Sequence, residues 1–466
     1  MSLVLGIGSS TQSTKALLVD ASSGEILDQR RAAHLTGGQV DPTAWLDAMH
    51  EATAELLPRA EAVAVGGQQH GMIALDSNDQ VVRNAMLWND TSSAPQAFEL
   101  IDELGGPEAS AEKLGSVLVA SFTGTKLRWM RDNEPDNSKR TASVCLPHDY
   151  LTWHLGGREQ LTTDHGDASG TGYYSTRDRV FLPELAEQYL GSEVKLPRIA
   201  EPSEIVGTTA HGAKIAAGTG DNMAAALGMN LQPGDVCVSI GTSGVASAVS
   251  AKSVHDASGG VSGFCDATGN YLPLACTLNG AKVLDFAANM LGVNHQQLAE
   301  LALADTPGAN GVTLLPYLDG ERIPNRPNAK GQFYGITTTT SREDIARAVV
   351  EGLLCSMRDA IEALQRATGV ATERVLLIGG GAKSEAIQKI APTIFGVPVV
   401  VPDSSEFVAL GAARQAAWAL SGETTPPEWQ LGNFRPYDGQ ECADAVGRYK
   451  VLRDFVEGLE ERTRQN

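Results

Sequence analysis

The sequence opens each of its halves with the same pattern: an apolar strand, a loop of Gly, Ser and Thr, and a second apolar strand. The pattern covers residues 3–7, 8–14 and 15–19 in the first half, and residues 236–240, 241–244 and 245–249 in the second. Such a repeat indicates an ancient duplication, although a strand, a glycine loop and a strand also describe an ordinary β-hairpin. With 466 residues, the chain is too long for one ordinary hydrophobic core. We therefore expect two large domains, residues 1–231 and 232–466.

Periodicity and end signals predict the other elements. Asp41 and Pro42 begin a helix that we expect to reach residue 57, because Asp caps helices and Pro suits the first turn. Apolar runs at 62–65 and 375–378 predict buried strands, and a helix should begin at 383. Apolar residues at helical spacing predict a long helix over 342–366, and a last helix is expected near 444–460. Strands that alternate with helices predict an α/β fold.

The charge balance excludes several classes of partner. The chain has 36 Lys and Arg against 56 Asp and Glu, a formal net charge of −20. Such a surface repels nucleic acid and anionic membranes, so phosphate binding needs local lysines, amides or a metal.

The six cysteines form no Cys-x-x-Cys pair, which favours free thiols over disulfides or a metal cluster. Because neither a membrane span nor a signal peptide is evident, we expect a cytoplasmic protein.

Three loops rich in Gly, Ser and Thr follow predicted strands, after residues 7, 240 and 378. Without bulky side chains, backbone N–H groups can converge on phosphate oxygens, and hydroxyl groups add further donors. One such loop alone is as well explained by a solvated turn, but three together favour a phosphate site. The chain has neither a Walker A loop nor the glycine fingerprint of dinucleotide-binding folds.

Asp221 stands where the loop 216–220 meets a helix of small residues. An aspartate at such a place is most often a helix N-cap. Beside a phosphate loop, however, a carboxylate can accept the proton of a hydroxyl group that attacks a phosphoryl group. We carry both interpretations forward.

Amide, imidazole, indole and carboxylate groups also gather beside apolar strands, at Gln69-His70 and at residues 88–90 (Trp-Asn-Asp). Together they are typical of polyol binding, although each alone is more often structural. Two histidines lie near aspartates, but their spacing does not match a zinc site. The residues concerned are His148, Asp149, Asp164, His165 and Asp167. No Gly-x-Ser-x-Gly motif supports serine hydrolysis.

Short motifs run along nearly the whole chain in a fixed order. They are residues 6–15 (GIGSSTQSTK), 67–71 (GQQHG), 87–90 (LWND), 122–127 (FTGTKL), 146–151 (LPHDYL), 167–171 (DASGT), 220–222 (GDN), 241–245 (GTSGV), 315–322 (LPYLDGER), 379–384 (GGGAKS) and 409–413 (ALGAA). Any one motif is weak evidence, but the ordered set is highly specific. It resembles the FGGY family of carbohydrate kinases, and most of all the members that act on xylulose.

The resemblance implies an α/β, actin-like ATPase fold, in which two RNase H-like domains enclose a ligand cleft. The N-terminal domain would bind sugar, the C-terminal domain would bind ATP, and Mg²⁺ would assist. Asp221 would be the general base, and the sugar would be bound by Gln69, His70, Trp88, Asp90, Asp221 and Asn222. The nucleotide and its transferred phosphate would meet Thr11, Gln12, Ser13, Lys15, Gly241, Thr242, Gly280, Gly380, Gly381, Ala382 and Lys383.

One position departs from the family pattern. Gly8 stands where the family carries an aspartate that helps to hold magnesium, so the metal site is unknown from the sequence. The resemblance implies ATP-dependent phosphorylation of D-xylulose to D-xylulose 5-phosphate. A kinase for another ketose or a polyol (ribulose, or a glycerol-like substrate) stays open, as does a non-catalytic protein that responds to sugar or nucleotide. The presence of Asp221 favours an enzyme. A homodimer also stays open.

Overall fold

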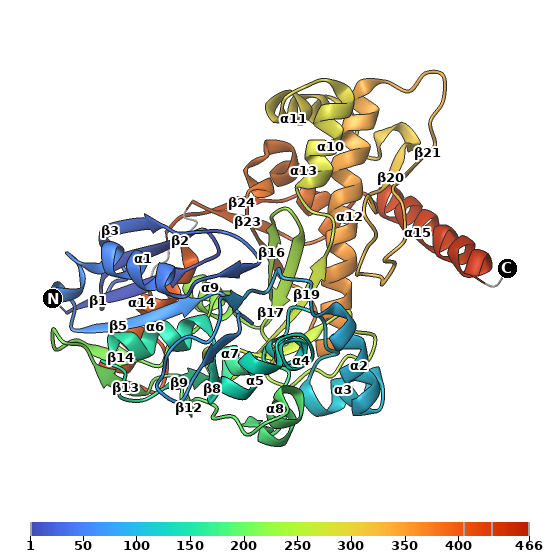
Figure 1. Ribbon diagram of the computed structural model, residues 1–466. Helices are drawn as coiled ribbons and strands as arrows, with labels where there is room; N and C mark the ends of the chain where they lie inside the picture. The colour runs from blue at the N-terminus through green and yellow to red at the C-terminus, as the bar shows by residue number, and fades with distance from the viewer. Residues whose placement is uncertain (1, 404–405, 430–431, 465–466) are drawn as a thin grey trace. The chain divides into compact units, whose positions relative to one another are not determined.

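The chain forms two compact units in the computed structural model, which describes residues 2–403, 406–429 and 432–464 (Figure 1). Unit 1 comprises Met1–Leu231, Ser250–Leu272 and Glu406–Leu431. Unit 2 comprises Gln232–Val249, Pro273–Ser405 and Gly432–Asn466. The chain first leaves unit 1 after residue 231 and returns to it twice, at residues 250–272 and 406–429.

Unit 1 is built on a mixed sheet with the strand order β13-β14-β5-β1-β2-β3, in which β15 also pairs with β5. The strands are β1 (Leu3–Ser9), β2 (Ser13–Asp20), β3 (Ile26–Ala33), β5 (Ala62–Gly67), β13 (Ile205–Thr208), β14 (Lys214–Ala216) and β15 (Thr219–Gly220). β1 is antiparallel to β2 and parallel to β5, and β5 is parallel to β14. The strands predicted at 3–7, 15–19 and 62–65 are confirmed, each slightly longer than expected.

Unit 2 repeats this arrangement in the order β19-β17-β16-β22-β23-β24. Its strands are β16 (Asp235–Ile240), β17 (Gly244–Ala248), β19 (Tyr271–Thr277), β22 (Arg374–Ile378), β23 (Val399–Pro402) and β24 (Phe434–Tyr437). β16 is antiparallel to β17 and parallel to β22, and β22 is parallel to β23. Each set of six strands therefore has three antiparallel strands, then two parallel ones, then an antiparallel strand at the end. This shared topology confirms the repeat read from the sequence.

Helices and shorter strand pairs complete both units. The helices of unit 1 are α1 (Thr43–Thr53), α2 (Ala94–Leu104), α3 (Pro107–Leu114), α4 (Thr123–Asn133), α5 (Pro135–Arg140), α6 (Pro147–Leu155), α7 (His165–Ala168), α8 (Pro183–Leu190), α9 (Asp221–Gly228) and α14 (Phe407–Ser421). Those of unit 2 are α10 (Lys282–Leu291), α11 (His295–Ala304), α12 (Arg342–Thr368), α13 (Glu385–Phe395) and α15 (Ala443–Arg464). The short strands are β4 (Gln39–Val40), β6 (Ile73–Leu75), β7 (Ala85–Met86), β8 (Ser143–Cys145), β9 (Thr162–Asp164), β10 (Tyr174–Ser175), β11 (Val180–Phe181), β12 (Arg198–Ala200), β18 (Ser262–Cys265), β20 (Thr313–Leu315) and β21 (Gln332–Tyr334).

The predicted helices differ from the observed ones at their ends. The long helix expected over 342–366 is α12, which begins with a capping box of Ser341 and Asp344. The helix expected over 41–57 ends early, at Thr53, and Leu57–Arg59 form a separate 3-10 turn. Pro58 lies in that turn, and proline cannot donate the backbone hydrogen bond that would continue a helix. The helix expected from residue 383 begins at Glu385, because Gly381–Lys383 form another 3-10 turn.

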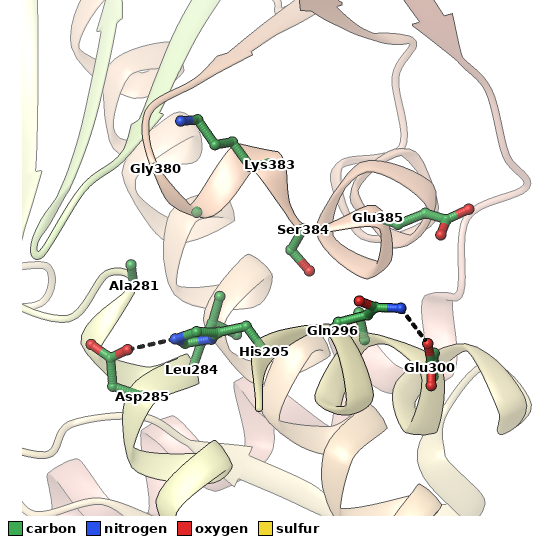
Figure 2. A pocket seen from close by; sticks show the side chains of 12 residues that line it. Ala281, Leu284, Asp285, His295, Gln296, Glu300, Gly380, Lys383, Ser384 and Glu385 are labelled. Carbon is green, nitrogen blue, oxygen red and sulfur yellow. Dashed lines mark hydrogen bonds and ion pairs between the residues drawn. The ribbon is translucent and has the colours of Figure 1, made fainter. Parts of the chain in front are cut away.

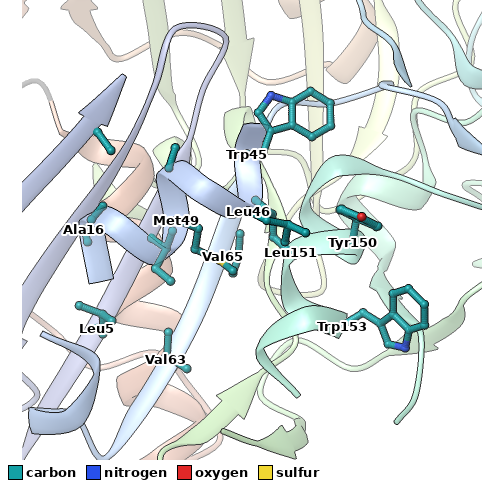
Figure 3. Packing of buried hydrophobic residues seen from close by; sticks show 14 of the residues in the cluster. Leu5, Ala16, Trp45, Leu46, Met49, Val63, Val65, Tyr150, Leu151 and Trp153 are labelled. Atoms are coloured by element: carbon teal, nitrogen blue, oxygen red, sulfur yellow. The ribbon is translucent and has the colours of Figure 1, made fainter. Parts of the chain in front are cut away.

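The core of unit 1 covers one face of its sheet (Figure 3). Leu5 and Val65, from β1 and β5, are fully buried against Trp45 of α1 and Leu151 of α6. Alternate apolar side chains on neighbouring strands build such a face, because successive side chains of a strand point to opposite sides. This packing fixes the carboxyl ends of β1 and β5, where the candidate site begins.

The other face of the sheet is covered by α14, which explains why residues 406–431 join unit 1. An added Cβ atom at Gly411 of α14 would lie 1.7 Å from the carbonyl oxygen of Ala224 in α9. One at Gly6 of β1 would lie 1.9 Å from the carbonyl oxygen of Ala409. The backbones approach so closely that only glycine fits at either position.

Two further sequence expectations were tested. All six cysteines are free thiols. Within the part of the chain that the structure describes, no helix is both long enough and apolar enough to cross a membrane.

Candidate active site

The hairpin of β1 and β2 presents a shorter loop than the sequence predicted. Ser9 pairs with Thr14 in the antiparallel register, so the loop proper is residues 10–12. Ser9, Ser13 and Thr14 are buried, and the Thr14 hydroxyl donates to Ser9 Oγ at 3.3 Å. Of the predicted phosphate ligands, Thr11 and Gln12 therefore lie in the loop, whereas the Ser13 side chain is enclosed in the sheet.

Lys15 and Gly8 face each other in the same hairpin register, next to the start of α14. Lys15 Nζ lies 2.5 Å from Glu406 Oε2, and both side chains are partly exposed. An added Cβ atom at Gly8 would lie 3.0 Å from the backbone nitrogen of Ala409. The first turn of α14 thus limits the room for any side chain at position 8.

Asp221 is the first residue of α9, and its side chain is not the helix cap. The N-cap position is occupied by Gly220, so the N-cap interpretation of Asp221 is wrong. Burial raises the pKa of Asp221 to about 6, against the opposing effect of hydrogen bonds from the backbone N–H groups of Asn222 and Asp221. A carboxylate with such a pKa is ionised at pH 7 and still basic enough to accept a proton.

Asn222 connects Asp221 to the loop after β5. Its amide nitrogen donates to Gln69 Oε1 at 2.7 Å and to Asp221 Oδ1 at 3.2 Å. A Cβ atom at Gly220 would lie 2.7 Å from Gln69 Cγ, so glycine is needed for this approach. The structure thus brings Gln69 to the adjacent pair Asp221 and Asn222, which lies far from it in the sequence.

His70 follows Gln69 and is held in one orientation. Its φ is +68°, and Nδ1 lies 2.8 Å from the carbonyl oxygen of Gly170. Burial and, next, the charge of Lys126 lower the pKa of His70 to about 4, so the ring is neutral at pH 7. Because a carbonyl oxygen only accepts, the proton is on Nδ1 and Nε2 is an acceptor. His70 therefore suits a ligand hydroxyl group that donates.

Two phenylalanine rings enclose His70, and sequence reasoning assigned no role to either. The His70 ring centroid lies 5.3 Å from that of Phe122 and 5.5 Å from that of Phe264. Phe122 belongs to a motif that we quoted without a function. Phe264 comes from the segment 250–272, whose return to unit 1 leaves no signal in the local sequence.

Trp88 and Asp90 differ in how available they are to a ligand. The Trp88 side chain is 45% exposed, and its Nε1–H donates to Thr11 Oγ1 at 3.2 Å. Asp90 is buried and accepts from Gln39 Nε2 at 2.8 Å and from the backbone N–H of Ser92 at 2.8 Å. Burial would raise the pKa of Asp90, but these bonds and the Ser92 hydroxyl outweigh it and lower the pKa. The Asp90 carboxylate is thus engaged by protein groups.

Unit 2 contains a pocket of ≈ 570 Å³ (Figure 2). It is lined by Ala281, Leu284, Asp285, His295, Gln296, Ala299, Glu300, Gly380, Gly381, Lys383, Ser384 and Glu385. A pocket of this size and mixed polarity suits a small organic ligand. Three of the predicted nucleotide residues are in this lining: Gly380, Gly381 and Lys383. Sequence reasoning missed the contribution of α10 and α11, including the contact between His295 Nε2 and Asp285 Oδ1 at 3.0 Å.

Three other predicted nucleotide residues of unit 2, Gly241, Thr242 and Gly280, lie in loops that are hydrogen-bonded next to Ala281 of the lining. The backbone N–H of Gly280 donates to the carbonyl oxygen of Thr242 at 3.1 Å, and that of Ala281 donates to Gly241. The glycine loop after β16 is therefore bonded to the chain that enters α10. Ala382 is buried and is not part of the lining.

Comparison with known proteins finds relatives that match both halves of the chain. Residues 3–228 match the N-terminal domain of the FGGY family of carbohydrate kinases, and residues 236–420 match its C-terminal domain. A xylulose kinase of Streptomyces coelicolor is 45% identical over 436 residues, which cover 90% of this chain and 89% of that protein. A xylulose kinase of Escherichia coli is 32% identical, covering 98% and 99%. The crystal structure of xylulose kinase from Bifidobacterium adolescentis superposes with a TM-score of 0.93 at 45% identity, covering 97% and 99%.

Proposed function

Because the chain belongs to the FGGY family of carbohydrate kinases, we propose that it transfers the γ-phosphoryl group of ATP to D-xylulose and forms D-xylulose 5-phosphate. Its relatives named xylulose kinase, at 45% and 43% identity, support this choice of sugar. The observation that carries the mechanism is the Asp221 carboxyl, held at the start of α9 and linked through Asn222 to Gln69.

In the proposed reaction Asp221 takes the proton from the terminal hydroxyl group of the sugar. The hydroxyl oxygen forms a bond to the γ-phosphorus, and the bond between that phosphorus and the bridging oxygen of ADP breaks. A base of this kind works best when its pKa lies just below the working pH, and burial brings Asp221 into that range. ADP leaves with the bonding electrons, and the protonated Asp221 releases its proton to solvent.

We assign the sugar to the groups around His70. In this assignment His70 Nε2 accepts a hydrogen bond from a sugar hydroxyl group. The hydrogen bond between Asn222 and Gln69 fixes both side-chain amides beside it, and the exposed indole ring of Trp88 offers the sugar an apolar face. Thr11, Gln12 and Lys15 are assigned to the transferred phosphoryl group, with Ser13 contributing no more than its backbone. Asp90 is assigned the lesser task of holding the turn at residues 90–92.

We assign the nucleotide to the pocket of unit 2, with Gly241, Thr242 and Gly280 at its phosphate end. Ala281→Phe should fill part of this pocket and raise the KM for ATP at least about tenfold, the loss expected from about 1.4 kcal/mol of binding energy. The KM for xylulose should stay close to the wild-type value, because Ala281 belongs to unit 2 and the assigned sugar residues to unit 1. Steady-state kinetics with each substrate varied in turn measure both constants.

Ala304→Phe is the matched control for this variant. Ala304 ends α11, whose first residues line the pocket, but Ala304 is exposed and is not part of the lining. An unchanged KM for ATP in Ala304→Phe and in Ala281→Phe alike would place the nucleotide elsewhere.

Magnesium would neutralise the phosphates of ATP during the transfer. It prefers oxygen ligands, keeps several waters and takes one or two protein carboxylates. The carboxylates of unit 1 that fit are Asp221 and, less well, Glu406, whose oxygens are held by Lys15. Position 8 supplies none. We therefore propose that magnesium would be held mainly by ATP and water, because Asp221 is assigned to the proton transfer and Glu406 contacts Lys15.

Gly8→Asp should lower the concentration of free magnesium needed for half-maximal rate, because it adds a carboxylate at the end of β1. The new Cβ atom must displace the first turn of α14 by a few tenths of an ångström, since Ala409 N would lie at 3.0 Å. Gly8→Ala introduces the same crowding without the charge and is the control. Magnesium titration at saturating ATP and xylulose separates the two effects. Equal half-saturation points in all three proteins would show that position 8 has no metal role.

A coupled assay of ADP release over xylulose, ribulose, glycerol and other polyols tests the proposed substrate. The highest kcat/KM should be found with D-xylulose. A higher value with another ketose or polyol would reassign the substrate, and no ADP release with any of them would favour a binding protein.

We propose the cytoplasm as the site of the reaction, where ATP is available and six free cysteines stay reduced.

A further inference from the structure

A group of three buried ionisable side chains in unit 1 has no part in the reaction proposed above. His148 Nδ1 lies 2.6 Å from Asp167 Oδ2 and 3.2 Å from Asp149 Oδ1, and all three side chains are at most 1% exposed. His148 and Asp149 begin α6, and Asp167 belongs to α7. We call these residues the buried triad.

His148 lies between two glycines of the candidate site: its backbone and Cβ face Gly67, and its imidazole ring faces Gly218. A Cβ atom at Gly67 would lie 2.7 Å from His148 Cβ, and one at Gly218 would lie 2.8 Å from His148 Cδ2. Gly67 directly precedes Gln68, Gln69 and His70. Gly218 precedes Thr219, Gly220 and Asp221. His148 therefore contacts both the turn that carries the assigned sugar residues and the turn that carries the assigned base.

The helix that carries Asp167 is connected to the same two turns. Asp164 caps α7 and accepts a hydrogen bond from Thr219 Oγ1 at 2.7 Å, two residues before Asp221. After α7, the carbonyl oxygen of Gly170 accepts from His70 Nδ1 at 2.8 Å. The triad is thus the buried centre of a network whose two ends are His70 and Asp221.

The composition of the triad does not serve stability alone. Two carboxyl groups face one imidazole, and His148 Nε2, Asp149 Oδ1 and Asp167 Oδ1 have no hydrogen-bond partner among residues 2–403, 406–429 and 432–464. Burial alone would lower the pKa of His148, but the two carboxylates outweigh it and raise the pKa to about 9. Burial also raises the pKa of Asp167 to about 6. A second buried carboxylate beside one cation costs free energy, and apolar residues would stabilise such a site at least as well.

We propose that His148 and Asp167 are positioning residues that hold the sugar turn (residues 68–70) and the base turn (residues 219–222) in one fixed relation. This proposal rests on the proposed function, because that function makes the relation between His70 and Asp221 matter. The charged triad keeps the imidazole ring in a single orientation against Gly218, while the backbone of His148 lies against Gly67. Without the Asp167 carboxylate, one positive charge on His148 would face one negative charge on Asp149. The fold would therefore remain, while the imidazole ring would no longer be held in one orientation.

Asp167→Asn in the full chain tests the proposal, with Glu351→Gln as the matched control. Glu351 is also a buried carboxylate, and its Oε1 lies 2.6 Å from Arg347 Nε, but it belongs to α12 of unit 2. Asp167→Asn should lower kcat/KM for xylulose about 10–100-fold, the size found when groups that orient a functional residue are replaced, while its unfolding temperature stays near the wild-type value. Glu351→Gln should lower the unfolding temperature and leave kcat/KM for xylulose near the wild-type value, because it leaves the Arg347 charge without that carboxylate.

Hydrogen–deuterium exchange provides a readout that does not depend on the reaction. In Asp167→Asn the amides of residues 67–71 and 217–222 should exchange faster together, and those of unit 2 should not change. A wild-type kcat/KM, or an unfolding temperature that falls in step with activity, would overturn the proposal; so would a variant that does not fold. If the wild-type protein phosphorylates no sugar, the proposed function fails, and the exchange data still decide whether the triad couples the two turns.

Discussion

Asp221→Asn should lower kcat for xylulose phosphorylation about 10²–10⁴-fold, the usual contribution of a general base. Asparagine has nearly the same shape and keeps the oxygen that accepts from Asn222, so the link to Gln69 should survive. What is lost is the ability to take a proton at neutral pH. The rate is measured by coupled ADP release at saturating xylulose and ATP. ATP binding, measured by calorimetry, should stay close to wild type because the assigned pocket belongs to unit 2.

Asp136→Asn is the control for the loss of a charge at a helix start. Asp136 also lies in the first turn of its helix, α5, but it is exposed and belongs to no assigned site. Its substitution should leave kcat unchanged. If Asp221→Asn phosphorylates xylulose at a rate near the wild-type rate, Asp221 is a binding group and not the base. A loss of ATP affinity equal to the loss of rate would point to misfolding.

Much of the candidate site follows from local sequence patterns. The strand–loop–strand repeat predicted both hairpins, because apolar runs and small polar loops are encoded over a few residues. The sequence pointed to the aspartate at residue 221 and to the amide and imidazole at 69–70 as separate candidate groups. In the structure the hydrogen bond from Asn222 to Gln69 joins them. The N-cap interpretation failed, since Gly220 takes the cap position and moves Asp221 one place into the helix.

What the sequence did not predict depends on contacts between distant segments. Ser13 reads as part of a polar loop, but it pairs with Ala33 in the sheet and its hydroxyl is buried. Phe264 reads as one apolar residue among many, and only the return of residues 250–272 to unit 1 brings it to His70. The pocket wall from α11 was missed for the same reason. Local periodicity identifies elements, whereas such walls are set by how elements pack.

The glycine in the motif at 409–413 is a second example. From the sequence, Gly411 interrupts a run of alanines and should weaken a helix, because glycine is a poor helix former. In the structure the absence of a side chain lets α14 lie directly on α9. The residue that local propensity disfavours is the one that the packing requires.

Gly411→Ala should therefore destabilise unit 1 by about 3 kcal/mol, the upper part of the range for overpacking a well-packed interior. Its Cβ atom would lie 1.7 Å from the carbonyl oxygen of Ala224, which belongs to backbone and cannot rotate away. The helices must separate, and the displacement would reach α9, which begins with Asp221. Thermal unfolding followed by circular dichroism, together with kcat, measures both consequences.

Gly447→Ala is the same substitution at a second helical glycine, and we expect it to stabilise the protein instead of destabilising it. Gly447 is also inside a helix, α15, but no atom lies within 4 Å of its added Cβ atom. There alanine should act through helix propensity alone and stabilise by up to about 1 kcal/mol. If Gly411→Ala raised the unfolding temperature as Gly447→Ala does, intrinsic propensity would outweigh packing at Gly411. The close crossing of α14 and α9 would then not be what holds the start of α9, and with it Asp221, in place.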